Sequence, residues 1–303
     1  MLRNFTLLVL LIAAAGSAFA CDMQATARPD SLSAFAANGQ NCLTTPPDGT
    51  TFDSDMETRF LAALNQERQI RGLEPLSLRE EMRPAARFHS LDMSVNRYFS
   101  HNSLSGRDHS DRLAAFDRTL LSNGSSENLA QFGPAVCYNQ DDIEVSCEGV
   151  PDLEEPSADI IVKDLHDKLM ASEGHRLNML DPDATHAAIG VVRAGTGVYV
   201  AQVFADVVGE LPDPLPVQVE AGDTLSFDAI LPGLTVKYYA LEADEERTRI
   251  RRNRIPPRLL GDVRLTLRAE LFFETVEDGT TTQRVAWMYP IGPAIEIVPP
   301  KES

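Results

Sequence analysis

The sequence lacks a long apolar run after its first twenty residues, and it is poor in basic residues. No later segment approaches the about 18 consecutive apolar residues that a membrane-spanning helix needs. Lys and Arg number 27 against 45 Asp and Glu, which gives a formal net charge of -18. Nucleic acids and anionic membranes are bound through basic side chains that neutralise phosphates. The composition therefore predicts neither a transmembrane segment nor a nucleic-acid partner.

The sequence also lacks the common catalytic and nucleotide-binding motifs. Six histidines are present, but no HExxH, GxSxG, P-loop or dinucleotide fingerprint accompanies them. No nucleophile motif points to a reaction, so the sequence favours a protein that is not an enzyme over one that is.

The first twenty residues, "MLRNFTLLVLLIAAAGSAFA", have one Arg near the start, an apolar run and small residues at 18 and 20. This pattern is typical of a secretory signal peptide over residues 1–20. We expect export, to the periplasm or the medium. Cleavage after Ala20 would place Cys21 first, and the alternative is a lipoprotein acylated at that cysteine.

Cysteine is scarce, with four residues in 303. In an exported chain an even number suggests disulfides, and pairing neighbours in sequence predicts Cys21 with Cys42 and Cys137 with Cys147. Acylation of Cys21 would leave Cys42 unpaired.

The chain after the signal divides into three parts by pattern. Residues 21–52 are small, polar and turn-forming, which predicts a loosely structured extension. Residues 53–208 carry helical patterns and two strands joined by a Gly turn, which predicts helices flanking a small sheet in a three-layer α-β-α sandwich. Residues 209–303 predict an all-β, sandwich-like module.

Individual elements follow from apolar spacing and from caps. We expect helices capped at Asp53 or Ser54 and ended at Gly72, from about Pro84 to Arg97, around "DRLAAF", and from Asp159 to about Met179. A long loop is expected from about Asn123 to Ser157. The C-terminal part should hold a strand at "VRLTLRAEL", where apolar and polar residues alternate, and a hairpin return after "EDGT".

Arginines gather in "EERTRIRRNR", residues 245–254, within an otherwise acidic chain. Charge runs are usually solvated, so a surface loop is the favoured interpretation. The alternative is a contact for an anionic glycan, a lipid head group or an acidic partner.

Several short polar segments stand in apolar frames: "LNQERQIRGLEPL", "AARFHSLDM", "RYFSHNS", "SSENLAQ", "SEGHRLNML", "AAIGVV" and "VYVAQVF". In order and spacing they resemble the CAP superfamily (cysteine-rich secretory proteins, antigen 5, pathogenesis-related 1; SCP domain), in its bacterial secreted branch. The resemblance covers roughly residues 53–206 and implies an α-β-α sandwich with a cleft lined by two His and two Glu.

Matched position by position, the resemblance assigns the first cleft histidine to His101, the first glutamate to Glu127 and the second histidine to His175. Ser172 stands where the family often has its second glutamate. Glu173 is one position further, about 100° around a helix, and should point elsewhere. Asn128, Ser172 and Gln202 are expected beside these residues.

Two imidazoles and a carboxylate can bind Zn²⁺ or another divalent ion, with His101 and His175 as ligands. The same groups can instead hydrogen-bond one another and fix the loops. His89 is expected in the core or behind the site, and His109, His166 and His186 at the surface.

The sequence thus favours an exported binding or interaction module. Its ligand would be lipid, sterol-like or an envelope glycan, in line with lipid- and sterol-binding members of the family. The alternative is a metal-dependent hydrolase that uses His101, Glu127 and His175.

Overall fold

The structure is a computed structural model, and it describes residues 21–301 apart from 29, 134–136, 139–143, 146–155, 244–245, 251–253 and 278–279. The helices are α1 (Leu32–Thr44), α2 (Ser54–Ile70), α3 (Arg83–Asn96), α4 (His109–Phe116), α5 (Ala158–Ala171) and α6 (Glu173–Met179). Of the helices in these ranges, none has the length and hydrophobicity needed to cross a bilayer.

A single large sheet runs through the molecule in the order β1-β6-β7-β3-β13-β11-β9-β10, with β2, β8 and β12 paired at its sides. Its first strands are β1 (Thr50–Phe52), β2 (Ser77–Leu78), β3 (Leu120–Phe132), β6 (His186–Ala194) and β7 (Gly197–Glu210). The C-terminal strands are β8 (Gln218–Glu220), β9 (Leu234–Ala243), β10 (Glu246–Ile250), β11 (Gly261–Glu277), β12 (Thr280–Met288) and β13 (Ile291–Val298). A separate pair joins β4 (Cys137–Tyr138) to β5 (Glu144–Val145).

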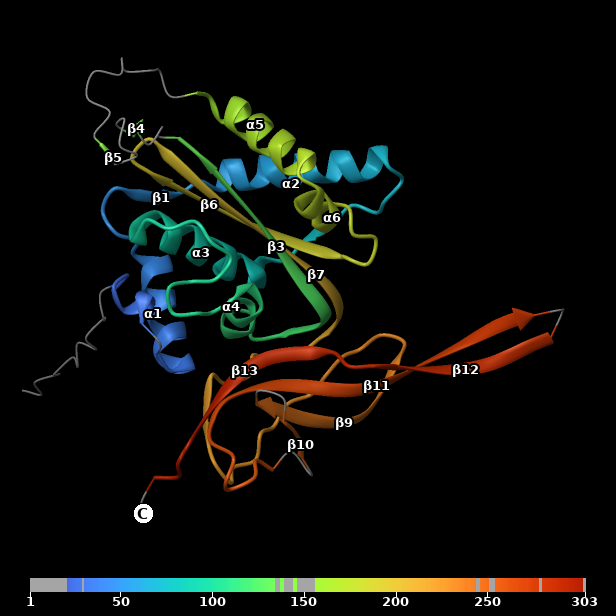
Figure 1. Cartoon of the computed structure of the whole chain (residues 1–303). Coiled ribbons are helices and arrows are strands. Elements are labelled where there is room, and N and C mark those ends of the chain that lie inside the picture. The colour runs from blue at the N-terminus through green and yellow to red at the C-terminus, as the bar shows by residue number, and fades with distance from the viewer. Residues whose placement is uncertain are drawn as a thin grey trace, which may run out of the picture.

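The first part of the sheet lies between two layers of helices, as expected from the sequence. Figure 1 shows α2, α5 and α6 on one face and α1, α3 and α4 on the other. Side chains of β6 alternate between the layers: Ile189 packs with residues of α2 and α5, and Ala188 packs with residues of α3 and α4. This part is the predicted three-layer α-β-α sandwich.

Helix α2 confirms the prediction made from its caps and spacing. The Asp53 side chain accepts a hydrogen bond from the Met56 amide, and Phe60 and Leu64 are fully buried. Near its end Arg68 is also buried, and it donates to four backbone carbonyls, those of Glu74, Met179, Asp181 and Ala184. The polar residues of "LNQERQ" therefore tie this helix to neighbouring loops.

The predicted loose extension over 21–52 is wrong, because it contains a helix and a strand. Helix α1 is capped by Ser31 and packs against α3, where Phe35 contacts Phe88 edge to face at 5.4 Å. The predicted disulfide between Cys21 and Cys42 is present and attaches the start of this segment to α1.

The expected loop from residue 123 to 157 is also wrong in its first part. Residues 120–132 form strand β3, which pairs with β7 along its length. Register shifts near Ser122 and Gly124 explain why the sequence lacks regular alternation here. The predicted bridge between Cys137 and Cys147 falls outside the described residues, since Cys147 is not among them.

The helix expected from residue 159 to 179 is in fact two helices. Ser172 has extended backbone angles, φ -80° and ψ 125°, and separates α5 from α6. Ser favours such a position because its side chain competes for backbone hydrogen bonds inside a helix. The break changes the direction of the chain just before His175.

The C-terminal strands form an all-β part, but the described strands continue the large sheet instead of forming two facing sheets. The connection is the pairing of Ile291 in β13 with Ser122 in β3. Leu241, Leu265 and Ile295 are fully buried in a second core. Beyond Leu271, β11 pairs only with β12, and Figure 1 shows these two strands projecting from the body as an arm.

The favoured surface-loop interpretation of residues 245–254 is wrong for 246–250, which form strand β10. Arg247 and Arg249 lie on this strand opposite Glu242 and Ala240 of β9. Arginine side chains at alternate positions of a strand share one face, so the cluster is ordered.

Candidate functional site

Glu127 lies at the centre of the candidate site, on β3. Its side chain is only 1% exposed, and both carboxylate oxygens have partners. Nη2 of Arg112 donates to Oε2 at 2.7 Å, and Nδ1 of His101 lies 3.0 Å from Oε1. His101 itself is half exposed, so the pair connects the interior with the surface.

Arg112 binds both the Glu127 carboxylate and the backbone of the loop before α4. It is buried on α4 and donates through Nη1 to the carbonyls of His101, at 3.0 Å, and Arg107, at 2.8 Å. The sequence analysis did not identify Arg112. A signal exists, because Arg112 lies one helical turn before the core residues Ala115 and Phe116, on the buried side of a short helix.

The pKa of Glu127 lies below its usual value. Burial acts to raise this pKa, but the hydrogen bond from His101 and the charge of Arg112 outweigh burial. The carboxylate is therefore ionised at neutral pH, and its charge is balanced by a fully buried guanidinium.

His89 lies behind this pair and is completely buried, as the sequence predicted. Its Nε2 donates to the carbonyl of Ser100 at 2.9 Å and lies 3.9 Å from Glu127 Oε1. Burial and the charge of Arg112 lower the pKa of His89 to about 3. A neutral ring thus supports the loop that carries His101.

His175 approaches from α6 and is linked to β3 and β7 through amide side chains. Asn128 Nδ2 donates to the His175 carbonyl at 3.0 Å, and Asn178 Nδ2 donates to Asn128 Oδ1 at 2.9 Å. Burial and the nearby charge of His101 lower the pKa of His175. The imidazole of His175 is therefore neutral at physiological pH.

Two further residues expected beside the site have different surroundings. Gln202 on β7 is completely buried and lies 3.4 Å from Asn128, while its Nε2 has no hydrogen-bond partner among the described residues. Ser172, at the break between the two helices, is half-buried, and Glu173 is exposed. Glu173 thus does not replace the missing second carboxylate.

The residues of this site do not fit a divalent ion held by Glu127. Both Glu127 oxygens and Nδ1 of His101 are already engaged, and a guanidinium lies where a cation would have to approach. Within the described part of the chain, no group of three or more His, Cys, Asp or Glu side chains is arranged to hold a metal ion. His101 and His175 alone would offer two imidazoles, fewer ligands than a zinc site uses.

The remaining histidines are less exposed than expected. His166 on α5 is buried, and burial lowers its pKa, so its surface assignment is wrong. His186 is half-buried at the start of β6, with Nδ1 2.9 Å from the Thr185 hydroxyl. His109 begins α4 and donates from Nε2 to the Ser125 carbonyl at 3.0 Å.

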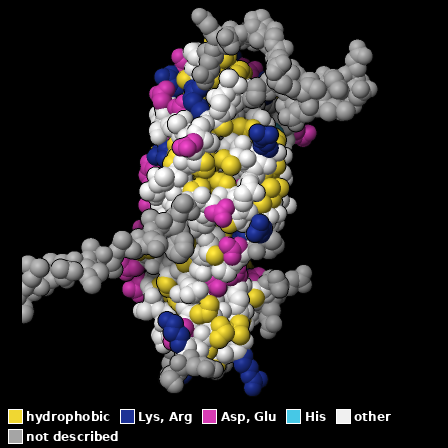
Figure 2. All heavy atoms as spheres, turned by 90° about the vertical axis from the view of Figure 1, so that its left-hand side faces the viewer, with side chains coloured by type: hydrophobic (Ala, Val, Ile, Leu, Met, Phe, Trp, Pro, Cys, Tyr) yellow, Lys and Arg dark blue, Asp and Glu magenta, His cyan; other side chains and the backbone are white. Residues whose placement is uncertain are grey.

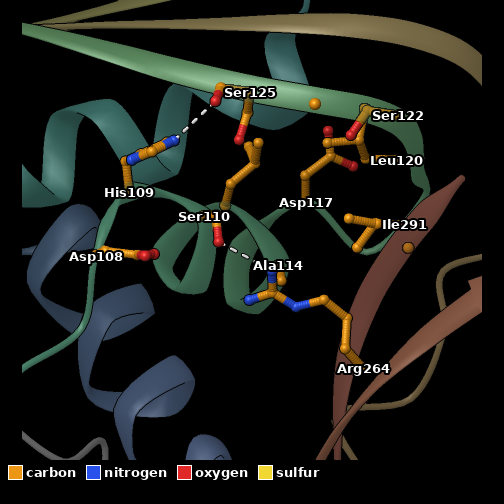
Figure 3. A pocket seen from close by; sticks show the side chains of 13 residues that line it. Asp108, His109, Ser110, Ala114, Asp117, Leu120, Ser122, Ser125, Arg264 and Ile291 are labelled. Carbon is orange, nitrogen blue, oxygen red and sulfur yellow. Dashed lines mark hydrogen bonds between the residues drawn. The ribbon is translucent and has the colours of Figure 1, made fainter. Parts of the chain in front are cut away.

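A separate cavity of about 280 Å³ lies where α4 and β3 meet the C-terminal strands. Figure 3 shows His109 and Ser110 on one side and Arg264 on the other. Arg264 donates to the hydroxyl of Ser110 and to the carboxylate of Asp111, both at 2.9 Å. The cavity is thus a seam closed by polar contacts between the two parts of the chain.

The three-layer sandwich with His101 and Glu127 joined at its centre defines a CAP-type domain. Residues 61–205 match the sequence model of the cysteine-rich secretory protein family (CAP), so this part of the chain is a CAP domain.

One curated relative is a bacterial protein. The uncharacterized protein YkwD of Bacillus subtilis (strain 168) is 31% identical over 160 residues, which are 53% of this chain and 50% of that protein. The chain thus matches about half the length of this curated relative.

Two solved structures also match. An extracellular protein containing a SCP domain from Bacillus anthracis str. Ames is 22% identical, over 50% of this chain and 41% of that one, with a TM-score of 0.37. An outer surface protein from Borrelia burgdorferi is 12% identical, over 50% of this chain and 93% of that one, with a TM-score of 0.38.

Proposed function

We propose that the protein is an exported bacterial binding module whose CAP site is a structural ion-pair network that holds a ligand-binding surface. The observation that carries this proposal is the state of Glu127, whose two oxygens are engaged by His101 and by buried Arg112. A buried guanidinium beside the carboxylate repels a cation and holds the carboxylate ionised, which suits a structural ion pair better than a metal ligand or a general base poised near neutral pH.

Export is part of the proposal. It is supported by the signal-like pattern over residues 1–20 and by the bridge between Cys21 and Cys42, since disulfides persist mainly in oxidising compartments. A Cys21 sulfur that is in a disulfide also has no free thiol for acylation. We place the CAP domain at residues 53–208, after an extension over 21–52, and the C-terminal module at 209–303.

The proposed ligand is apolar, a lipid or sterol-like molecule. Phe99 and Leu104 are each 50% exposed on the segment that carries His101, and Leu177 is 65% exposed on the helix that carries His175. Large apolar side chains that are exposed on both segments carrying the site histidines favour a binding surface. The network below would hold these segments in place.

The test is binding of the chain to vesicles made from a bacterial polar lipid extract, followed by co-sedimentation. Replacing Phe99 or Leu177 alone by Ser should weaken binding about tenfold, and replacing both should weaken it about a hundredfold, since each buried apolar side chain contributes about 1.5 kcal/mol. The matched control is Ile70→Ser, because Ile70 is 70% exposed on α2 and carries no part of the site. His101→Ala and His175→Ala should leave vesicle binding within about twofold.

The hydrolase alternative predicts another pattern. An enzyme would lose turnover by orders of magnitude in His101→Ala and His175→Ala. Ester or amide hydrolysis by the purified chain that is abolished in both variants would overturn the proposal. So would a double variant of Phe99 and Leu177 that binds vesicles as tightly as the parent chain does.

A further inference from the structure

One face of the C-terminal sheet carries arginines and aromatic rings in alternation. Arg249 of β10 lies 4.6 Å from the ring of Tyr238 on β9, and Arg268 of β11 lies 5.9 Å from the same ring. Arg268 stacks on Trp287 of β12 at 3.7 Å and lies 6.0 Å from Tyr289. We call these residues, with Arg247 over Tyr289 at 5.4 Å, the arginine-aromatic face.

The register explains why these side chains meet. Arg268 pairs with Tyr238, and Glu270 pairs with Trp287 on the neighbouring strand. Side chains two positions apart on a strand share a face, so Arg268 and Glu270 lie together, as do Val285 and Trp287. Residues on the opposite side, such as Leu265 and Leu267, are buried in the core.

The arginine-aromatic face is open to solvent. Trp287 is 44% exposed and Tyr289 is 42% exposed, and farther along the arm Phe272 and Val285 are also exposed. A cluster of large exposed aromatic residues on one sheet face is unusual for a surface without a ligand. Elsewhere, the side of the molecule in Figure 2 has acidic and basic side chains interspersed.

Some charged side chains of the arginine-aromatic face have a partner of opposite charge, and others do not. Arg247 pairs with Glu242 and Lys237 with Glu270. Among the described residues no carboxylate pairs with Arg249 or Arg268, whose recorded contacts are with rings. Nε of Arg268 is buried without a hydrogen-bond acceptor in that part of the chain. In a chain of net charge -18, this is a local positive site.

We propose that the arginine-aromatic face binds an anionic polysaccharide. Flat aromatic faces pack against sugar rings, and planar guanidinium groups form paired hydrogen bonds with carboxylate or phosphate. A nucleic acid fits less well, because its dense phosphates, with one charge per about 1.7 Å, would be repelled by Glu242 and Glu270. The charges of an anionic glycan are separated by neutral sugar, so they can avoid these carboxylates. This site is separate from the proposed apolar ligand surface on the CAP domain.

Trp287 supplies the test, because it is the one tryptophan in the sequence and its fluorescence reports on this face alone. The chain is titrated with polygalacturonate, a carboxylated sugar chain, and with phosphorylated mannan. Neutral mannan tests the need for charge, and polyaspartate tests the need for sugar. We expect a saturable fluorescence change with at least one of the two anionic glycans, weakened by added salt, and little response to either control.

Variants place the binding on the face. Arg249→Gln and Tyr289→Ala should each weaken glycan binding about tenfold, with unchanged thermal unfolding. Arg71→Gln is the control, because Arg71 is an arginine with a 40% exposed side chain that lies directly after α2 and outside this face. The double change of Phe99 and Leu177 to Ser should leave glycan binding intact, which separates this proposal from that for the CAP site.

Three results would overturn the proposal. One is the absence of a saturable response to both anionic glycans. Another is equal affinity for polyaspartate, which would mean attraction by charge alone. The third is that dilution alone changes the fluorescence over the same concentration range in which sedimentation shows a dimer dissociating. A second copy of the chain would then be the occupant of the face.

Discussion

At the scale of single residues, the pairing of Glu127 with Arg112 determines what the CAP site can do. Two opposite charges, each 1% exposed, are stable only together, since either one alone would be a buried charge without compensation. Arg112 also holds the backbone at His101, so the pair fixes the position of the surface imidazole.

Removing Arg112 should therefore be costly. Arg112→Met is expected to lower the free energy of unfolding by about 3–5 kcal/mol, and adding Glu127→Gln should recover part of the loss. Urea unfolding of the two single variants and the double variant measures the coupling. Arg59→Met, which breaks exposed pairs with Asp55 and Asp159, should leave the urea midpoint nearly unchanged. If the losses of unfolding free energy caused by Arg112→Met and Glu127→Gln simply add up in the double variant, the pairing is contradicted.

His89 should make stability depend on pH. Its folded pKa of about 3 lies below the ordinary value of 6.5, so the folded state holds it neutral while the unfolded state binds a proton. Its contribution is present above pH 6.5 and is lost as pH falls toward 3, which amounts to about 2 kcal/mol between pH 7.5 and 5.

The measurement is urea unfolding of the chain and of His89→Gln at both pH values. Gln can keep the donor to the Ser100 carbonyl without titrating. The loss of stability at pH 5 should shrink by about 2 kcal/mol in the variant. The same loss in both proteins would rule out His89 as its source.

The sequence analysis named some of the residues that the structure brings together around Glu127 and missed others. His101, Glu127 and His175 lie in short segments whose spacing resembles the family. The structure brings His101 and Glu127 into contact, and the pKa of His175 responds to His101. Arg112 was missed because its partners are 5 to 15 residues away in sequence and depend on how α4 packs.

At the scale of elements, close packing of α3 on β6 depends on Gly190. A Cβ at this position would lie 2.3 Å from the backbone of Ala86 and Arg87. Gly190→Ala should therefore separate the helix from the strand and lower stability by about 3 kcal/mol, measured by urea unfolding.

Gly174 offers the matched control for this substitution. It lies in α6 with open space around it, so Gly174→Ala should cause no loss and should gain up to about 1 kcal/mol. Similar destabilisation by both changes would contradict the close approach at Gly190.

The elements that the sequence predicted are those with regular spacing and strong caps, such as α2 and α3 and the strands β6 and β7. Strand β3 was missed because Gly124 and its polar neighbours interrupt the alternation, although its pairing with β7 compensates. The break at Ser172 was missed because no proline marks it and a second helix begins at the very next residue.

Helix α1 and its disulfide lead to a prediction of their own. Replacing both Cys21 and Cys42 by Ser opens a loop with a separation of 21 residues. Stability should fall by about 3 kcal/mol, measured by urea unfolding without reductant. Reductant should lower the stability of the parent chain toward that of the variant and should leave the variant unchanged. A parent chain insensitive to reductant would contradict a stabilising bridge.

At the scale of the whole molecule, two parts share one sheet and offer separate surfaces. The CAP domain presents exposed apolar residues above a buried ion-pair network, and the C-terminal strands present arginines and aromatic rings. The seam between them is closed by Arg264, which reaches from β11 to α4. The sequence predicted an α/β part followed by a β-rich part, but the pairing of β13 with β3 that joins them involves residues far apart in the chain, Ser122 and Ile291.

We propose that the His101 and Glu127 pair is a structural network and not a metal centre. Calorimetric titration of Zn²⁺ at neutral pH, into protein purified without chelator or nickel, tests it most directly. We expect no tight equivalent of Zn²⁺, and the same weak heat in the parent chain, His101→Ala and Glu127→Gln. One tightly bound equivalent in the parent chain that is lost in both variants would contradict the claim.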